Sequence, residues 1–458
     1  MYVLFLLIQM TMPAVENSVG YLASGTSIQP KVTSESSPMI HRSFGNWTMM
    51  FHANAFLVDI QQTGPRGADK FFSANWLMPM LTRQFGRQNL TLRTMLSLEP
   101  ATVTNRSYPL LFQSGETAYG FSLINGQHPH DFFMEIAARY DIRLGERSQV
   151  FVYGGPVGEA ALGPTAFPHR PSASENPLAV LGHHQQDSSH IATNVVTVGM
   201  AAGPLQLEAS GFHGREPDEG RWNVNRGKPD SFATRLTVAP HKNLTAQFST
   251  GRLNSPEDAA SHDTVRTTAS VHYSPHFASG HLSSSLIWGR NKDLIATRRR
   301  IFNSYNLEIT SKFRGRNWLW TRIENVDRDS ALLPVAQTPS QSPPDCRLCG
   351  ILGPRLSVLD AEEEVTPIHK HIVPGPDGRP IQIDEDPVGR VQAYTFGYER
   401  ELPVRLSWLN VGLGAQFTTY TMPAAFKPVY GDRPTTVAFF LRLRPAGNMT
   451  DHMKMMHR

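Results

Sequence analysis

The stretch RQNLTLRTMLSLE, from Arg87 to Glu99, decides the fold. Within it, apolar residues such as Leu90 and Leu92 alternate with polar residues such as Thr91 and Arg93. Successive side chains of a β-strand point to opposite faces, whereas those of a helix repeat every 3.6 residues. A period of two therefore predicts a strand with one apolar face and one polar face.

The same alternation recurs along the chain, and no segment shows a comparably long helical period. Examples are LQLEAS from Leu205 and LTAQFS from Leu244. The pattern predicts about 16 strands, within a range of about 14 to 18. We expect them near 45–60, 71–85, 87–99, 131–143, 148–158, 192–202, 204–213, 229–240, 243–254, 265–276, 280–291, 301–313, 317–328, 390–402, 408–421 and 434–445.

The connections between these strands differ in length. Several are short turns rich in Gly, Pro and Asn, such as 85–88 and 202–204. The long ones are 100–130, 159–191, 214–228 and 329–389. Short turns at one end and long loops at the other are typical of outer-membrane barrels. We predict an all-β fold, a single transmembrane antiparallel up-and-down β-barrel over 45–446, with 329–389 as a long external loop.

Soluble sandwiches and propellers also contain many alternating strands, so they are the alternative. Strand length favours the membrane, because the predicted strands match the ~9–11 residues that cross a bilayer at a tilt. Aromatic residues near strand ends agree with interfacial belts. These are Trp47, Phe71, Phe72, Trp76, Tyr140, Trp288, Trp318, Trp320, Tyr394, Tyr398, Trp408 and Tyr420.

Charged residues lie on the polar rows of the predicted strands. They are Glu99, Glu135, Arg139, Glu208, Arg235, Glu308, Arg322 and Glu324. Facing lipid, each would cost about 2–4 kcal/mol near the midplane, so we expect them to face the lumen. A lumen that carries both signs of charge suits either a hydrophilic pathway or a packed polar plug.

Composition excludes several classes of protein. The 458 residues are only 18% charged and include 2 Cys, 35 Gly and 34 Pro, which argues against a coiled coil or a disulfide scaffold. The net charge of +4 is dispersed along the chain, so a nucleic-acid partner is not expected. No apolar run reaches the ~20 residues of a membrane-spanning helix, which leaves a β-barrel as the membrane option.

The ends of the chain differ from the barrel region. Residues 1–10, MYVLFLLIQM, have the size of an export signal but lack a basic start, so a mis-assigned start is the alternative. Residues 1–44 as a whole are expected to comprise this signal and a disordered lead-in. Residues 447–458 form a tail in which His452, Met453, Met455, Met456 and His457 cluster, a soft ligand set that favours Cu(I). The alternative is a frayed polar terminus.

Histidines supply the most distinctive local chemistry. They gather in two segments, 126–131 (GQHPHD) and 182–190 (GHHQQDSSH). Imidazole and carboxylate ligands suit Zn, Cu, Fe or Ni, so we predict a metal site if the two segments meet at the barrel mouth. The alternatives are loops fixed by His–Asp hydrogen bonds, or acid–base catalysis. The candidate ligands are His128, His130, Asp131, His183, His184, Asp187 and His190.

Other motifs carry weaker signals. Cys346 and Cys349 form a lone CxxC, and an exported chain favours a loop disulfide or an incidental pair there. Glu99, Glu116 and Glu159 are among the carboxylates that a hydrolase could use, but the sequence assigns them no partner. The sequence therefore favours a barrel that is not an enzyme.

Taken together, the motifs resemble a poorly characterised family of bacterial outer-membrane β-barrel proteins of Acidobacteria-like genomes. The resemblance covers about residues 45–445. It rests mainly on QHPHD at 127–131, on GHHxxDSxH at 182–190 and on GREPDE at 214–219. Members often bear Met/His-rich ends, so the resemblance implies copper or heavy-metal handling, with no established activity. The CxxC loop and the weak export signal depart from the family pattern.

These observations predict a porin-like channel or transporter of the bacterial outer membrane. Its expected partners are outer-membrane lipid and periplasmic efflux or metal-handling proteins. The sequence leaves the cofactor open, with Cu or Zn as the candidates. A role in copper or heavy-metal export or tolerance would fit that ligand chemistry. The alternatives are a barrel enzyme with a His/Glu site in its mouth loops, and a structural surface barrel.

Overall fold

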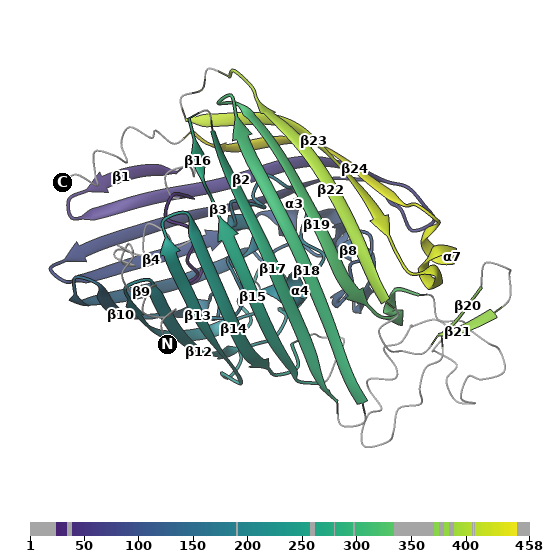
Figure 1. The fold of residues 1–458 in the computed structure, drawn as a ribbon, viewed down its shortest axis with the longest axis horizontal. Coiled ribbons are helices and arrows are strands. Elements are labelled where there is room, and N and C mark those ends of the chain that lie inside the picture. The colour runs from purple at the N-terminus through teal and green to yellow at the C-terminus, as the bar shows by residue number, and fades with distance from the viewer. Residues whose placement is uncertain are drawn as a thin grey trace, which may run out of the picture.

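The computed structural model describes residues 24–33, 39–188, 191–256, 262–278, 280–295, 298–333, 371–374, 380–383, 389–404, 406 and 408–446. Sixteen long strands form a closed antiparallel wall (Figure 1). They are β2 (Trp47–Gln62), β3 (Lys70–Phe85), β4 (Gln88–Leu96), β9 (Phe133–Gly145), β10 (Ser148–Val157), β11 (Thr193–Ala202), β12 (Leu205–His213), β13 (Ser231–His241), β14 (Leu244–Leu253), β15 (Thr264–Tyr273), β17 (Gly280–Ile295), β18 (Arg298–Phe313), β19 (Asn317–Arg328), β22 (Gly389–Glu401), β23 (Leu409–Thr421) and β24 (Thr435–Pro445).

The barrel closes where the first long strand pairs with the last. β2 pairs with β24 from Ala55 opposite Leu443 to Gln62 opposite Thr436. Two short strands, β1 (Ile40–Phe44) and β16 (His276–Phe277), extend turns at the rim. The predicted barrel is confirmed, and each of the sixteen predicted strands overlaps an observed one. None of the helices in the described part of the chain is long and apolar enough to cross a membrane.

The two ends of the barrel differ as predicted. The residues between consecutive strands number two at 86–87, 146–147, 203–204 and 242–243 at one end. The other end carries the long connections 97–132, 158–192, 214–230 and 422–434. The 329–388 connection leaves from that same end, and part of it forms the β20–β21 hairpin (His371–Pro374 with Pro380–Ile383) outside the wall (Figure 1). Cys346 and Cys349 lie outside the described residues.

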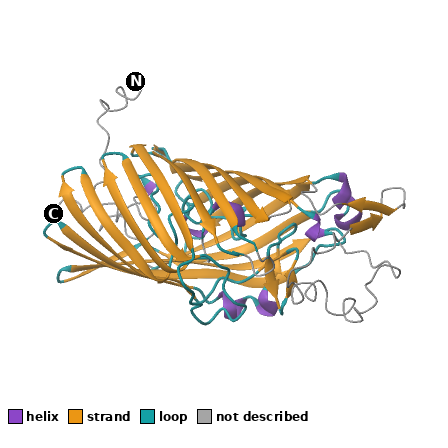
Figure 2. Cartoon of the chain, turned by 90° about the horizontal axis from the view of Figure 1, so that it is seen from below, coloured by secondary structure: helices purple, strands orange, loops and turns teal. Residues whose placement is uncertain are grey.

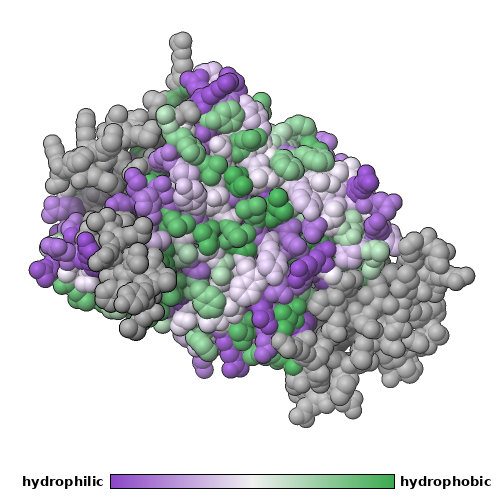
Figure 3. All heavy atoms as spheres, viewed as in Figure 1, coloured by the Kyte–Doolittle hydropathy of each residue, from purple (hydrophilic) through white to green (hydrophobic). Residues whose placement is uncertain are grey.

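Alternation separates an apolar outer face from a polar inner face. Leu207 on β12 is 56% exposed, whereas its neighbour Glu208 is 2% exposed. Figure 3 shows hydrophobic side chains distributed over the strand wall. All eight charged residues expected to face the lumen are buried, namely Glu99, Glu135, Arg139, Glu208, Arg235, Glu308, Arg322 and Glu324.

The aromatic belts are smaller than the sequence suggested. Phe71, Tyr398 and Trp408 are exposed. Other members of the expected set are buried, namely Phe72, Trp76, Trp318, Trp320 and Tyr420. Adjacent residues of a strand must point to opposite faces, so Phe71 and Phe72 could not both reach an interface. The lumen accepts these rings because it is filled by protein.

Two long connections fold into the lumen and form a plug, which we define as 97–132 together with 158–192. Figure 2 shows loops and short helices inside the ring of strands. The first connection contains α3 (Glu99–Thr102), η2 (Thr104–Arg106), β5 (Tyr108–Pro109), β6 (Glu116–Ala118), β7 (Phe121–Leu123) and β8 (Gly126–Gln127). The second contains η3 (Phe167–His169) and α4 (His183–Gln186). Both loops, which the sequence placed at the long-loop end, therefore extend into the lumen, where polar side chains of the wall bind their backbone.

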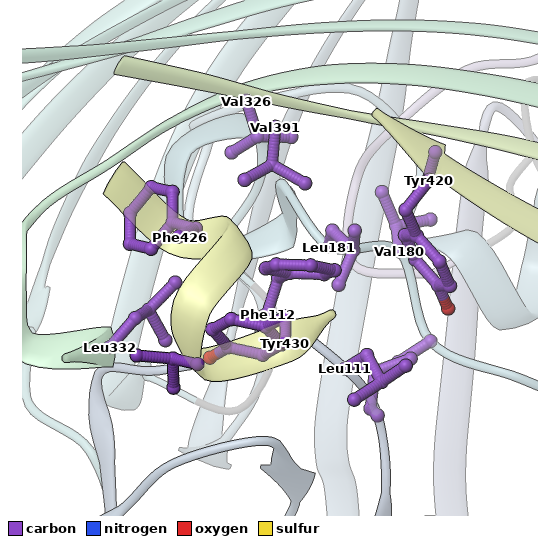
Figure 4. Packing of buried hydrophobic residues seen from close by; sticks show 14 of the residues in the cluster. Leu111, Phe112, Val180, Leu181, Val326, Leu332, Val391, Tyr420, Phe426 and Tyr430 are labelled. Carbon is purple, nitrogen blue, oxygen red and sulfur yellow. The ribbon is translucent and has the colours of Figure 1, made fainter. Parts of the chain in front are cut away.

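The plug has an apolar core near the long-loop end. Figure 4 shows Phe112 and Leu181 of the plug among side chains from the wall and from the β23–β24 connection. That connection forms η6 (Ala424–Phe426) and α7 (Lys427–Tyr430), and the rings of Tyr430 and Phe112 stack at 4.2 Å between centroids. η4 (Ser330–Leu332) adds Leu332 to the same cluster. This core fixes one end of the plug by hydrophobic burial.

The segment 24–33 also occupies the lumen. The backbone amide of Val32 donates to the carbonyl of Lys242, in a turn at the short-turn end. Deeper in the lumen, the Thr26 hydroxyl accepts a hydrogen bond from Arg235 at 2.9 Å, and Ser27 contacts Thr165 of the plug at 3.0 Å. The expectation of a disordered lead-in over 1–44 therefore does not hold for 24–33, because polar lumen groups bind this segment.

Candidate metal centre in the plug

Buried ion pairs anchor the plug to the wall. Arg170 of the plug donates to both carboxylate oxygens of Glu308 on β18, at 2.7 and 3.0 Å. Arg322 lies on β19, opposite Glu308. It donates to the same carboxylate at 3.1 Å and to the Leu178 carbonyl of the plug at 2.9 Å. Because all three charged side chains are nearly inaccessible to water, losing one partner would leave buried charge unbalanced.

Further anchors bind the backbone of the second plug loop. Arg235 pairs with Glu208 on the neighbouring strand at 2.8 Å and donates to the Gly163 carbonyl at 3.0 Å. The Ser249 hydroxyl accepts from the Gly163 amide at 2.8 Å. On β17, Gly289 leaves room for α4, because a Cβ there would lie 2.2 Å from the Gln185 carbonyl oxygen. The lumen face of the wall is thus built to hold this loop.

The two plug loops meet at three side chains. Glu116 begins β6, His128 follows β8, and His184 lies in α4. The Glu116 Oε1 atom is 2.8 Å from His128 Nε2 and 2.6 Å from His184 Nε2. The side chains are 2%, 2% and 10% exposed, respectively. One carboxylate oxygen and two ring nitrogens therefore converge in a site almost sealed from solvent, with all three ligand atoms within 4.8 Å of one another.

The protonation of His128 is set by its other ring nitrogen. His128 Nδ1 lies 2.6 Å from the carbonyl oxygen of Pro129, which can only accept, so Nδ1 carries the proton. In the neutral ring, Nε2 then presents its lone pair to the Glu116 carboxylate. Two electron-rich atoms at this separation need a proton or a cation between them. A backbone carbonyl on Nδ1 is also how many metal-binding histidines are oriented.

Two more side chains surround this triad. His183 Nε2 is 3.9 Å from Glu116 Oε1, and its Nδ1 donates to the Val180 carbonyl at 2.5 Å. Glu216, from the 214–230 connection, lies 3.9 Å from His128 Nε2 and 4.0 Å from His184 Nε2. A small movement would bring either group into a four-coordinate shell, the usual number for Zn²⁺.

Other predicted ligands lie elsewhere. His130 Nδ1 is 2.9 Å from Glu99 Oε1, and Asp131 accepts from Arg221 at 3.4 Å. Burial lowers the pKa of His130, but the adjacent Glu99 carboxylate outweighs burial and the net pKa shift is upward. Asp187 holds the plug through its backbone carbonyl, which accepts from Arg266 at 2.5 Å. His190, His452, Met453, Met455, Met456 and His457 fall outside the described residues.

Sequence reasoning joined the two histidine segments correctly for His128 and His184 but missed their carboxylate. Glu116 is separated from His128 by a β-hairpin, β6–β7, and Glu216 comes from a third loop. The sequence contained both carboxylates within short motifs, Glu116 in SGE at 114–116 and Glu216 in GREPDE at 214–219. Neither motif has a spacing that identifies a metal ligand by itself.

Comparisons with known proteins find similarity to solved structures only. No family model matches the chain, and no curated protein matches it. Among solved structures, the anion-selective porin from Comamonas acidovorans aligns over 87% of this chain and 99% of its own, with 9% identity and a TM-score of 0.46. OprB of Pseudomonas putida aligns over 87% and 94%, with 8% identity and a TM-score of 0.46. Salmonella typhi OmpF aligns over 88% and 100%, with 8% identity and a TM-score of 0.45.

Proposed function

We propose that this chain is a channel-type barrel of the bacterial outer membrane whose lumen is closed by its own plug. The observation that carries this proposal is the closed sixteen-stranded wall with apolar side chains outside and ion pairs inside. Exposed residues such as Leu207, Val198 and Phe232 suit acyl chains, whereas the charges that face the plug would be costly in lipid.

Passage through this barrel requires the plug to move. The second plug loop is bound to different parts of the wall, by Arg170 at β18 and by Arg235 at β13. A solute would therefore cross only when some of these bonds open. Removing either partner of a buried salt bridge leaves the other charge unpaired. A single substitution at such a pair should therefore weaken the attachment of the loop strongly.

Conductance in planar bilayers tests the channel. The native protein should show low conductance with rare openings, and Arg170→Gln should open more often or more widely. Arg252→Gln is the matched control, because Arg252 pairs with Asp263 at an exposed site away from the plug. A native barrel that is continuously open would contradict a plugged lumen, and absence of current in both native and variant protein would favour a structural barrel.

We further propose that Glu116, His128 and His184 bind a divalent transition metal that joins the two plug loops. Imidazole and carboxylate favour Zn²⁺ or Cu²⁺ over softer ions. The sealed position argues against a hydrolytic site, which would need access for a substrate. Such a centre would tie the first plug loop, at β6 and β8, to α4 of the second and stabilise the closed plug.

Binding of Zn²⁺ and Cu²⁺ to the full chain in detergent tests this centre. We expect about one equivalent, with affinity reduced by at least about 100-fold in His128→Ala and His184→Ala. His213→Ala is the control, since His213 pairs with Asp230 at 2.8 Å outside the triad. Equal binding by native and triad variants would reject the centre while leaving the channel proposal intact.

Copper or heavy-metal export or tolerance, with periplasmic efflux partners, is the wider role that this centre would serve. The support is the ligand chemistry alone. Cells that lack the protein should become more sensitive to Cu or Zn, and a triad variant that still folds should fail to restore tolerance. Restoration by His128→Ala would separate the barrel from metal handling.

A further inference from the structure

A second group of metal-type ligands lines the lumen, apart from the Glu116 triad. Trp76, Met78 and Met80 point inward from β3, and Met95 points inward from β4. All four are buried, and Met50 of β2 and Met134 of β9 pack against them. Five thioethers thus gather on four neighbouring strands of the wall.

The plug adds an imidazole to this patch. His169, in η3, lies with its Nε2 atom 3.0 Å from the Met95 sulfur. Its ring centroid is 4.3 Å from that of Trp76. A second histidine is His52 of β2. Its ring centroid lies 4.7 Å from that of Trp76, edge to face, and 6.1 Å from that of His169. His52 is opposite Met78, and Met50 is opposite Met80, in the β2–β3 register.

The composition of this patch is unusual for a lumen wall. Other inward rows carry polar side chains, as with Glu208 on β12 and Arg266 on β15, or apolar chains and rings without sulfur, as with Phe56 on β2 and Trp320 on β19. The patch on β2, β3, β4 and β9 differs from these rows by its five thioethers. The interior of a barrel is normally polar, and packing alone would be served equally by Leu or Phe. Methionine differs from leucine by a polarizable sulfur that binds soft metal ions.

We propose that Met95 and His169, with a further thioether from the Met78–Met80 row, form a site for a monovalent soft ion, Cu(I) or Ag(I). Thioether and imidazole are the ligand classes that select Cu(I), whereas Zn²⁺ prefers the nitrogen and oxygen set at Glu116. Trp76 stands beside the imidazole, where its ring face can also attract a cation. This site depends on neither the channel nor the triad proposal.

The site also places an ion at a junction within the lumen. Met95 belongs to the wall, whereas His169 belongs to η3 of the plug. The segment 24–33 reaches the same helix, because the Gln29 side chain donates to the His169 carbonyl at 3.2 Å. A bound ion would therefore hold η3 between the wall and this segment. Binding should accordingly order both the plug and the segment 24–33.

Binding of Ag(I) to the full chain in detergent tests the proposal, with Ag(I) as the probe because it needs no reductant. The background for all variants removes the tail ligands by Met453→Ser, Met455→Ser, Met456→Ser, His452→Gln and His457→Gln. We expect about one equivalent, with affinity reduced by at least about tenfold in Met95→Leu and more in Met95→Leu/His169→Gln. Met200→Leu is the matched control, because Met200 is 51% exposed on the outer face.

The outcomes separate this site from the others. Unchanged Ag(I) affinity in both lumen variants would overturn the proposal, and so would displacement of Ag(I) by an equal concentration of Zn²⁺. Loss of binding in His128→Ala instead would assign the ion to the Glu116 triad. If the double variant fails to fold, anomalous scattering from Ag(I) in crystals of native protein decides, since the peak must lie between the Met95 sulfur and His169 Nε2.

Discussion

Two sectors of the lumen wall hold the same plug by different means. The sector from β12 to β19 uses Arg–Glu pairs and directed bonds to the plug backbone, as at Arg235 and Arg322. The sector from β2 to β4 adds thioethers and a Trp ring, against which His169 rests, to neutral hydrogen bonds such as that from the Thr102 hydroxyl to the Ser73 carbonyl at 2.8 Å. Charged bonds fix position and register, whereas soft contacts adapt to small shifts. We therefore expect the first sector to determine stability and the second to determine ligand binding.

The largest expected effect is loss of the central carboxylate in the charged sector. Glu308→Gln leaves Arg170 and Arg322 facing a neutral amide in a site closed to water. We expect the free energy of unfolding to fall by about 3–5 kcal/mol. Urea unfolding followed by heat-modifiable mobility on gels measures this. A loss below about 1 kcal/mol would mean that the charged sector does not fix the plug.

The stability of the barrel should depend on pH through Glu159 of the plug, whose neighbour Glu135 lies on β9, between the two sectors. Burial, followed by the charge of Glu135, raises the pKa of Glu159 from 4.5 to about 8. The folded chain thus holds this proton more tightly than the unfolded chain does, so stability from Glu159 is full below about pH 4.5 and is lost as pH rises to about 8. Midpoints measured across this range should fall, and Glu159→Gln should flatten the curve. An equal slope in the variant would assign the effect to other groups.

A smaller change in stability is expected in the soft sector. Met95→Leu nearly conserves volume, so the free energy of unfolding should change by less than about 1.5 kcal/mol. The same variant should bind Ag(I) at least about tenfold more weakly, which separates a ligand role from a packing role. A loss of stability as large as that in Glu308→Gln would mean that the two sectors do not differ in kind.

The smallest effect is expected outside the plug. Arg252 pairs with Asp263 at 2.6 Å, with half of the Arg252 side chain exposed. Arg252→Gln should change the free energy of unfolding by about 0–1 kcal/mol, because exposed ion pairs are screened by water and salt. Urea unfolding in parallel with Glu308→Gln provides the comparison, and a larger loss would point to a network beyond this pair.

The sequence determined the wall. Stretches such as 87–99 and 204–213 predicted strands, their two faces and the inward position of Glu208, because a period of two allows only one assignment of faces. The same rule limited the aromatic belts, since Phe71 and Phe72 must diverge. Strand number and the difference between short and long connections also followed from local spacing.

Only the tertiary structure decided what fills the barrel. Irregular loops carry no period, so nothing in 97–132 or 158–192 states whether they lie outside or within. Their position depends on long-range bonds, such as Arg170 with Glu308, 138 residues apart. For the same reason, Glu116 joined His128 and His184 only when two loops met, and Met95 met His169 only when the plug reached the wall. Backbone groups that have left a sheet must find partners elsewhere, and here the polar lumen supplies them.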